Sequence, residues 1–388
     1  MRDNILNAMK KGEVTIAVMA DFSKAFDTVA YHSVLNKLHC EGFTKSSLRW
    51  ITSYLTDRQQ YVQIDDCTST TLPVMFGVPQ GSILGPVLFN LYVNDLSGVL
   101  PQSVDCHQYA DDTTLLSHCK PACLHVGEAN IQLALDAVET WSKNNNLVLN
   151  PTKTKVMVFA TQQLCHYHQL EDYRPALSTN GKRLERLAST KLLGVHFQEH
   201  LSWTEHINKT ISSSYATLAV LRKLKNLALF SLKKHLAECL ILAKLEYCSA
   251  VTDPLPMYLT KRLSRVQLGA AAFVTNRYTR EEDIINLGWL PIPERRQFSM
   301  LNLAYNALYN TEWPSYLPLE RHIPARTLRS SDEVQLQVPL TTGNFQHACA
   351  TVFNKLPKDL RNCTSTSQFK IQCKGYLTKS AKRRMLIN

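Results

Sequence analysis

Three aspartates interrupt apolar, strand-like segments of the sequence. Asp21 closes the run VTIAVMA, and Asp111 and Asp112 lie together in QYADDTTLL. A carboxylate beside an apolar strand costs desolvation unless a cation compensates, and two adjacent aspartates also repel each other. Hard oxygen ligands that converge from two strands suit Mg²⁺, especially paired ions that assist phosphoryl or nucleotidyl transfer. The alternative, for an isolated Asp-Asp pair, is an acidic turn that is simply solvated.

Short strands and helices in the first half of the chain must position these aspartates. The β-rich run 14–20 has few polar groups and predicts a buried strand. Further strands are expected at 107–117 on both sides of Asp111-Asp112, at 147–149 and at 156–159, with a hairpin that pairs 61–64 with 72–75. The spacing of apolar residues predicts helices at 24–38, 46–55, 82–96 and 131–143.

The second half of the chain changes character. Leucines at three- and four-residue spacings predict long helices at 204–224, 228–247 and 257–274. We therefore expect a boundary near residue 200. A second, softer boundary is expected at 311–330, where the sequence is rich in Pro and Arg.

The excess positive charge is confined to the second half. Residues 1–200 contain 17 Lys+Arg against 19 Asp+Glu, whereas residues 201–388 contain 26 against 13. A surface that follows nucleic acid has this kind of charge, although a solvated basic helical surface would have it too.

The composition places the chain among folded proteins inside the cell. Of 388 residues, 45% are hydrophobic, and the length suggests two or three domains. The charged start MRDNILNAMKKGE does not resemble a secretory signal, and the sequence has no long uncharged apolar run for a membrane span. Without an export signal, we expect a cytoplasmic or nuclear location and reduced cysteines. No CxxC pair is present, so we expect no zinc site.

Three segments, in this order, carry a resemblance to a known family: ADFSKAFDTV, GVPQGSILGPVLFNLYVNDL and YADDT. Together they resemble the motifs of reverse transcriptases of the jockey-like branch of LINE (non-LTR) retrotransposons. The later segments LVLNPTKTK, KLLGV, LSWTEHI, FNKLPKDL and FKIQCKGYL are similar to the same family, so the resemblance runs over nearly the whole chain. It implies an α+β fold: a polymerase palm with an antiparallel sheet flanked by helices at 1–200, a helical thumb or connection at 201–310, and a helical C-terminal region at 311–388.

The resemblance assigns Asp21, Asp111 and Asp112 to the catalytic metal site, with two Mg²⁺ ions or Mn²⁺ as a substitute. Asp27 is not a ligand in this family, and the predicted helix turns it away from the strand end. Lys153, in NPTKTK, matches a lysine near the leaving pyrophosphate, where it could protonate the leaving group or neutralise charge. A solvated loop lysine is the alternative, and Lys155 is close enough to exchange roles with it.

Three further residues correspond to the nucleotide site of the family. Phe26 resembles the aromatic gate that excludes a ribose 2′-OH, and its alternative is a core aromatic. Gln80 and Gly81 resemble the residues beneath the incoming nucleotide and the template base. Their alternative is the ordinary chemistry of a helix start.

Leu193, Gly194 and Val195 match the hairpin that grips the primer end in this family, with plain strand packing as the alternative. The implied partners are an RNA template, a DNA primer and dNTPs, with no membrane; the sequence leaves the oligomeric state open. The implied reaction is attack of the primer 3′-OH on the α-phosphate of a dNTP, with pyrophosphate leaving.

The resemblance also implies that this chain lacks part of the family's architecture. The fingers region lies upstream of the DFSKAFD motif in LINE reverse transcriptases, and we expect it to be missing here, with weak or absent activity as the consequence. One alternative is a non-catalytic remnant that still binds nucleic acid. Another is a viral RNA-dependent RNA polymerase, which Phe26 and the YADD motif disfavour. We expect the basic cluster at 379–384 to be a frayed tail, with nuclear import or RNA contact as alternatives.

Overall fold

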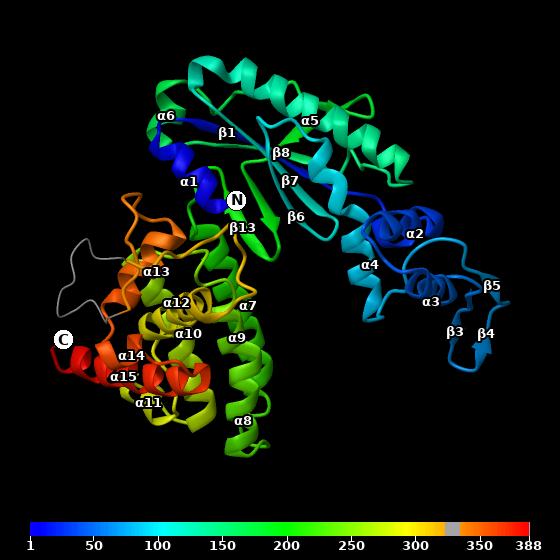
Figure 1. Ribbon diagram of the computed structural model, residues 1–388. Helices are drawn as coiled ribbons and strands as arrows, with labels where there is room; N and C mark the ends of the chain where they lie inside the picture. Colours follow the sequence, from blue (N-terminus) through cyan, green and yellow to red (C-terminus); the bar gives the residue numbers. More distant parts are fainter. Residues whose placement is uncertain (323–333, 388) are drawn as a thin grey trace. The chain divides into compact units, whose positions relative to one another are not determined.

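The computed structural model describes residues 1–322 and 334–387 (Figure 1). The chain divides into two compact units. The first consists of Met1 and residues 8–189, and the second consists of residues 2–7 and 190–388. Part of the Pro- and Arg-rich stretch at 311–330, expected as a soft boundary, lies outside the described residues.

A five-stranded sheet with the order β11-β8-β1-β7-β6 forms the centre of the first unit. Its strands are β1 (Val14–Ala20), β6 (Asp105–Tyr109), β7 (Asp112–Cys119), β8 (Lys155–Phe159) and β11 (Glu185–Arg186). All neighbours run antiparallel except β11 and β8. The central strand β1 is almost wholly buried, as its apolar sequence predicts.

Helices cover this sheet and close its core. The long helix α5 (Leu124–Asn144) packs on β7 and β1 and follows the sheet in Figure 1. Helix α2 (Tyr31–Cys40) packs on α3 (Lys45–Leu55) and on α4 (Leu84–Val93). One apolar cluster joins the inner faces of these helices to β1 and β7, with Leu38, Phe89 and Leu135 fully or almost fully buried. The predicted antiparallel sheet flanked by helices is therefore confirmed.

Smaller elements complete the first unit. Helix α1 (Arg2–Lys10) leads from the second unit into β1, and α6 (Gln162–Tyr167) follows β8. Short strands are β2 (Gln59–Gln60), β3 (Gln63–Ile64), β4 (Cys67–Thr68), β5 (Leu72–Pro73), β9 (Ser178–Thr179) and β10 (Lys182–Arg183). β2 pairs with β5, and β3 pairs with β4. The predicted pairing of 61–64 with 72–75 is thus wrong, because the chain folds back earlier and forms two nested hairpins.

Two other local predictions are also wrong. The expected helix at 24–38 is broken: Ala25–Asp27 form a single 3₁₀ turn after Lys24, which has a left-handed φ of 49°, and α2 starts only at Tyr31. The expected strand at 147–149 is reduced to one isolated bridge between Leu149 and Phe22.

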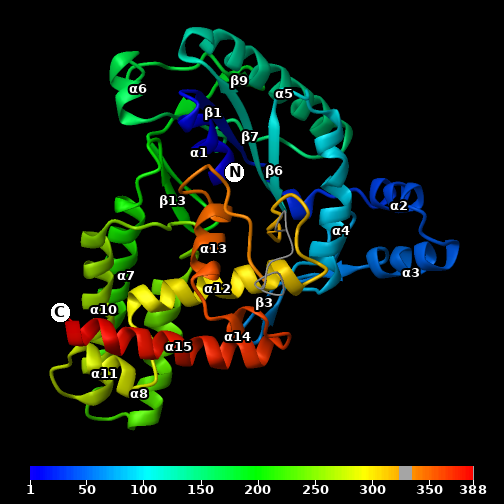
Figure 2. The same cartoon turned by 60° about the vertical axis from the view of Figure 1, so that its left-hand side comes forward.

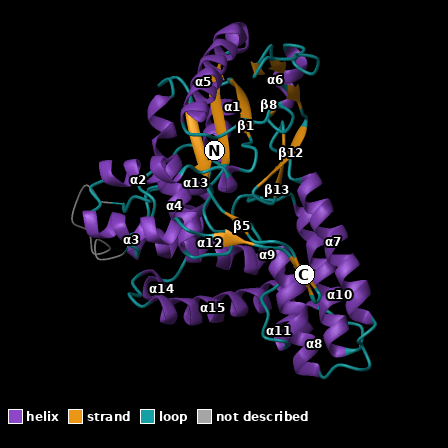
Figure 3. Cartoon of the chain, turned by 90° about the vertical axis from the view of Figure 1, so that its right-hand side faces the viewer, coloured by secondary structure: helices purple, strands orange, loops and turns teal. Residues whose placement is uncertain are grey.

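The second unit is mostly helical, as predicted (Figure 3). A hairpin of β12 (Ser189–Leu192) and β13 (Val195–Gln198) precedes the helices α7 (Thr204–Arg222), α8 (Phe230–Ala237), α9 (Ala243–Glu246), α10 (Met257–Thr275), α11 (Glu281–Asn286), α12 (Ile292–Tyr309), α13 (Phe345–Asn354), α14 (Lys358–Arg361) and α15 (Thr366–Ile387). A π-helical turn at Glu238–Leu242 joins α8 to α9. Helices α12, α13 and α15 enclose a separate apolar core that contains Tyr305, Phe353 and Phe369, and Figure 2 shows α12 and α15 side by side.

The basic cluster at 379–384 is part of helix α15, so the expected frayed tail is wrong. Arg384 forms ion pairs with Glu281 and with the buried Glu294. These contacts, and the buried Leu377 and Ala381 on the same helix, hold the segment against the second unit. No helix among the described residues is long and apolar enough to cross a membrane.

Candidate active site

The register of the central sheet brings three of the four predicted catalytic residues, Asp21, Asp112 and Lys153, into one row. Strand β1 pairs with β7 up to Ala20 and Thr113, and β6 pairs with β7 up to Tyr109 and Asp112. Continuing the first register by one residue places Asp21 opposite Asp112. Residues opposite each other on neighbouring strands point to the same face of a sheet. Asp21, Asp112 and Tyr109 therefore share one face at one end of the sheet.

Lys153 extends this row on the other side of Asp21. Strand β1 pairs with β8 up to Met19 and Lys155, so the same register continued by two residues leads to Asp21 and Lys153. The side chains follow this placement, since Lys153 Nζ lies 3.6 Å from Asp21 Oδ1. Lys155 instead pairs with Glu185, at 2.6 Å. The structure therefore separates the two lysines that the sequence left exchangeable.

The loop before β8 fixes the backbone around Asp21. The amide of Asn150 donates to the Asp21 carbonyl at 2.8 Å, and the Asp21 amide donates to Thr154 Oγ1 at 3.3 Å. The Asn150 side chain accepts hydrogen bonds from the amides of Thr152 and Lys153, a local turn that aspartate and asparagine favour. Asn150 and Thr154 were not predicted as site residues, although an Asn-Pro turn directly before Lys153 is a visible signal.

A tight hairpin carries Asp111 and Asp112. Only Ala110 and Asp111 connect β6 to β7, and Ala110 has a positive φ of 53°, as the first position of a type II′ turn requires. Asp111 thus lies at the tip of the turn, and Asp112 begins β7. The predicted strand–turn–strand arrangement around the two aspartates is confirmed.

The three carboxylates influence one another. The pKa of Asp112 is raised above its ordinary value, first by desolvation and then by the negative charges of Asp111 and Asp21. Asp21 Oδ1 is buried and accepts no hydrogen bond within the described part of the chain, although the Lys153 ammonium lies 3.6 Å from it as an ion pair. A buried carboxylate oxygen without a hydrogen-bond donor, beside two further carboxylates, fits a hard cation. In the described ranges, however, no three His, Cys, Asp or Glu side chains stand close enough to form a ready-made coordination group.

Phe26 lies where two distant backbone segments cross. Its ring stacks on Phe89 with centroids 4.2 Å apart and is partly buried against the core of the first unit. Its carbonyl accepts a hydrogen bond from the Val78 amide at 2.9 Å, and the Gly77 amide donates to Val29 at 2.8 Å. The segment 77–78 therefore fixes the turn that presents Phe26. Gly77 was not singled out as a site residue, although it opens the GVPQG motif.

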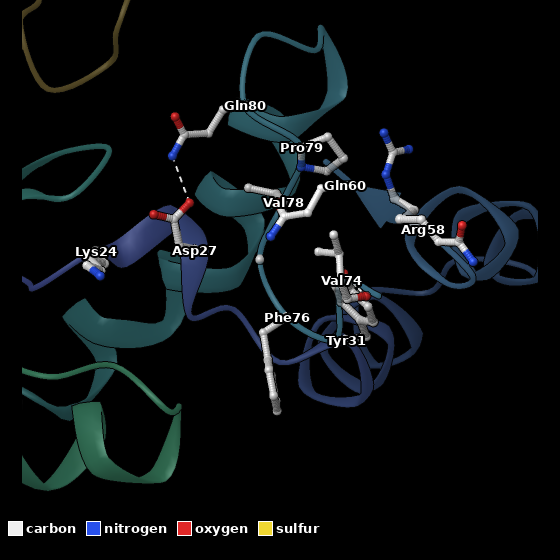
Figure 4. Close-up of a pocket in the computed structure, with 12 residues that line it drawn as sticks. Lys24, Asp27, Tyr31, Arg58, Gln60, Val74, Phe76, Val78, Pro79 and Gln80 are labelled. Atoms are coloured by element: carbon white, nitrogen blue, oxygen red, sulfur yellow. Dashed lines mark hydrogen bonds between the residues drawn. The ribbon is translucent and has the colours of Figure 1, made fainter. Parts of the chain in front are cut away.

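Gln80 and Gly81 lie directly after this crossing, before α4. The Gln80 side chain donates from Nε2 to Asp27 Oδ1 at 2.7 Å (Figure 4). Asp27 is thus a hydrogen-bond partner of Gln80. The helix that was expected to turn Asp27 away from the strand end is absent, since Asp27 lies in the 3₁₀ turn. Gly81 has a φ of +77°, and a Cβ added there would meet no atom within 4 Å. The backbone at Gly81 is therefore open to a close-lying ligand.

Leu193, Gly194 and Val195 belong to the second unit. Leu193 and Gly194, both with positive φ, form the two-residue turn between β12 and β13, and Val195 begins β13. The Tyr247 hydroxyl donates to the Leu193 carbonyl at 2.8 Å, and its ring lies within 3 Å of where a Gly194 Cβ would be. Side-chain packing of Tyr247 thus requires glycine at this turn.

Comparison with protein families assigns the first half of the chain to a polymerase family. Residues 2–197, about half of the chain, match the family described as reverse transcriptase (RNA-dependent DNA polymerase), and the chain belongs to this family. The matched range contains Asp21, Asp111, Asp112 and Lys153, together with the hairpin at 193–195. The predicted family resemblance is confirmed.

Curated relatives point to mobile elements. The chain is 29% identical over 209 residues to the RNA-directed DNA polymerase from mobile element jockey of Drosophila melanogaster. The aligned region covers 52% of this chain and 22% of that relative. It is 28% identical over 229 residues to the probable RNA-directed DNA polymerase from transposon BS of the same organism, and that aligned region covers 58% of this chain and 24% of the relative. The chain thus spans less than a quarter of the length of these relatives.

A solved structure of telomerase from Candida albicans is also similar, at 11% identity and a TM-score of 0.34, covering 77% of this chain and 50% of that chain. This level of likeness is too low to refine the fold described above.

Proposed function

We propose that this chain provides the catalytic palm of an RNA-directed DNA polymerase of a jockey-like non-LTR retrotransposon. The primer 3′-OH would attack the α-phosphate of a dNTP opposite an RNA template. A new P–O bond forms, the bond to the bridging oxygen breaks, and pyrophosphate leaves. The observation that carries the proposal is the row in which Lys153, Asp21 and Asp112 follow one another across neighbouring strands.

The three aspartates would hold two Mg²⁺ ions, with Mn²⁺ as a substitute. When bound, such ions lower the pKa of the attacking hydroxyl and neutralise charge on the phosphates. Two observations support this assignment: Oδ1 of Asp21 is buried without a hydrogen-bond donor within the described residues, and the charges of Asp111 and Asp21 help to raise the pKa of Asp112. A bound cation would satisfy the first and offset the second. Backbone hydrogen bonds to Asn150 and Thr154 hold the main chain of Asp21, which would limit where its carboxylate can meet an ion.

Lys153 would act on the leaving group. Its side chain is 65% exposed, and among the described residues its ammonium contacts the Asp21 carboxylate at 3.6 Å, so it can turn toward an incoming triphosphate. A proton donated from Nζ would go to the departing pyrophosphate. The primer 3′-OH would give its proton to solvent water, and Lys153 would regain a proton from water after the step.

The remaining predicted residues would select and place substrates. Phe26 would exclude the 2′-OH of a ribonucleotide, and Gln80 with Gly81 would lie beneath the nucleotide and the template base. The hairpin at Leu193, Gly194 and Val195 would grip the primer end. Support for these roles is local: the Phe26 turn is fixed by segment 77–78, and Gly81 leaves open space.

A second candidate is nucleic-acid binding without catalysis. It is favoured by the finding that, among residues 1–322 and 334–387, no three potential ligands already form a coordination group. The two candidates differ in their dependence on the carboxylates, since binding does not require them.

Primer extension on an RNA template separates the candidates. The chain is assayed with dNTPs and Mg²⁺, beside Asp111→Asn and a control variant, Asp172→Asn, that changes an exposed aspartate on the loop after α6. Polymerase function predicts extension that is abolished by Asp111→Asn and unchanged by Asp172→Asn, with unaltered binding of the primer–template. Equal extension by both variants would overturn the proposed metal site, and binding without extension by any protein would favour the second candidate.

A further inference from the structure

A side chain from a distant part of the second unit holds the tip of the hairpin β12–β13. Leu193 and Gly194 form this tip, and Tyr247, the residue directly after α9, contacts both of them. The Tyr247 hydroxyl donates to the Leu193 carbonyl oxygen at 2.8 Å, across a sequence separation of 54 residues. Its ring atom Cε1 lies 2.9 Å from the position of a Cβ on Gly194. The ring therefore packs on the bare backbone of the tip, while the hydroxyl fixes the orientation of the tip.

Two arginines of α12 anchor the turn that carries Tyr247. Glu246, just before it, forms an ion pair with Arg295 at 2.7 Å. The carbonyl of Ser249, just after it, accepts a hydrogen bond from the buried Arg296 at 2.8 Å. Breaking such contacts would leave a largely buried charge without its partner, which is strongly unfavourable. The tyrosine is thus presented from a fixed turn, and a fixed turn can impose one conformation on the hairpin tip.

The base of the hairpin is held by other contacts. Strand β13 packs on α7, and the His196 amide donates to His206 Nδ1 at 3.4 Å. Val195 and Phe197 on this strand are buried, whereas Tyr247 remains 53% exposed. A change at Tyr247 should therefore release the tip and leave the strands packed. This separation allows a role in substrate placement to be distinguished from a role in folding.

We propose that Tyr247 is a positioning residue for the primer, because it holds the hairpin tip in the conformation that meets the primer 3′ end. The proposal rests on the proposed function of Leu193, Gly194 and Val195, and it adds to them a residue from the end of a helix. Tyr247 acts through the tip and touches no reacting atom. When a binding conformation is populated for only part of the time, the apparent affinity falls by that fraction. Release of the tip should therefore weaken the use of primer and leave the use of dNTP unchanged.

Primer extension by the full chain tests this split, with KM measured separately for primer–template and for dNTP. Tyr247→Phe keeps the ring and removes the hydrogen bond to the tip. The KM for primer–template should rise about 2–10-fold, the range that one net hydrogen bond gives, while kcat at saturating primer and the KM for dNTP stay unchanged. A lower kcat with both KM values unchanged would overturn the proposal, because a smaller fraction of folded enzyme would explain it.

Two comparisons control this experiment. Tyr258→Phe removes a hydroxyl from a tyrosine of the same unit that is 54% exposed and bonds to Thr204 Oγ1 at 3.1 Å, so it should change neither KM. Equal rises in Tyr258→Phe and Tyr247→Phe would overturn the proposal. Gly194→Ala should raise the KM for primer–template by a larger factor in the parent than in a Tyr247→Ala background, where no ring opposes the new methyl group. Equal factors in the two backgrounds would also overturn it.

A fluorescence measurement in EDTA tests the same contact without synthesis. The probe is a DNA primer with 2-aminopurine as its 3′-terminal base, annealed to an RNA template and saturated with the full chain. Tyr247→Ala should reduce the fluorescence change that the parent produces on binding, and a 2-aminopurine well upstream in the duplex should respond equally to both proteins. Equal responses at the 3′ end would overturn the proposal. A reduced response in a chain that does not extend primers would contradict the polymerase proposal alone. Extension that Asp111→Asn abolishes, with an unchanged response in Tyr247→Ala, would contradict the role of Tyr247 alone.

Discussion

Gly77 is a residue at which a single added methyl group should destabilise the first unit strongly. A Cβ at this position would lie 2.9 Å from Asp27 Cα, the Asp27 carbonyl oxygen and the Phe26 carbonyl oxygen, all of them backbone atoms. Its φ of +89° adds about 1–2 kcal/mol for any L side chain. Relieving the clash would separate the segments joined by the Gly77–Val29 and Val78–Phe26 hydrogen bonds, at about 1 kcal/mol each. Gly77→Ala should therefore cost about 3–4 kcal/mol.

Gly42→Ala provides the matched control. Gly42 has a φ of +86°, and a Cβ there would meet no atom within 4 Å, so only the backbone cost of about 1–2 kcal/mol applies. Amide hydrogen exchange of the buried strand β1 reports the opening of the first unit. Exchange in Gly77→Ala should exceed that in Gly42→Ala by about 30-fold, which corresponds to a difference of about 2 kcal/mol. Equal exchange in the two variants would refute the crossing of segments 26–29 and 77–78 as a tight contact.

Three other predictions follow from the site and its surroundings. Lys153→Gln should lower kcat by about 10²–10⁴-fold in primer extension, as loss of a general acid does. Lys155→Gln should have a small effect on kcat because Lys155 pairs with Glu185. A larger loss of kcat in Lys155→Gln than in Lys153→Gln would exchange the two roles. Phe26→Val should narrow discrimination against ribonucleotides by about 2–4 kcal/mol, and unchanged preference in competition assays would leave Phe26 a core residue stacked on Phe89. Burial lowers the pKa of His107 to about 4, whereas the pKa in the unfolded chain is near 6.5. Between about pH 4 and pH 6.5 the folded state therefore binds fewer protons than the unfolded state. Stability should fall as the pH drops through this window, and His107→Gln should flatten the thermal-melting profile there; a profile unchanged by the substitution would contradict the assignment.

The sequence predicts the framework of the site because local signals determine it. The run 14–20 is almost entirely apolar on both faces and rich in β-branched residues, which favours a buried strand, and the YADD segment is short enough to allow a single tight turn. The positions of Asp21, Asp111 and Asp112 at strand ends follow from these two facts. The functional roles of these residues came from the family resemblance and remain proposals.

Contacts between distant segments explain what the sequence did not predict. The helix expected at 24–38 fails because residues 77–78 bond to the backbone of Phe26 and Val29, and that pairing replaces the first turns of the helix. The spacing of residues within 24–38 contains no information about the partner segment at 77–78. The frayed tail expected at 379–384 fails for the same reason, since Glu281 and Glu294, about ninety or more positions earlier, supply the counter-charges for Arg384.

The alignment of Lys153, Asp21 and Asp112 across neighbouring strands has a consequence for which insertions and deletions the chain tolerates. Asp21, Asp112 and Lys153 come from three separate segments, and the pairing of β1 with β7 and β8 sets the register that aligns them. Loss or gain of one residue inside any of these strands would turn every later side chain of that strand to the opposite face. By contrast, the nested hairpins at 59–73 pair only with each other, so their lengths can change without altering that alignment. Length variation among copies of such an element should therefore collect in the hairpins and be excluded from the three strands, even where their residues are exchanged for others of similar size.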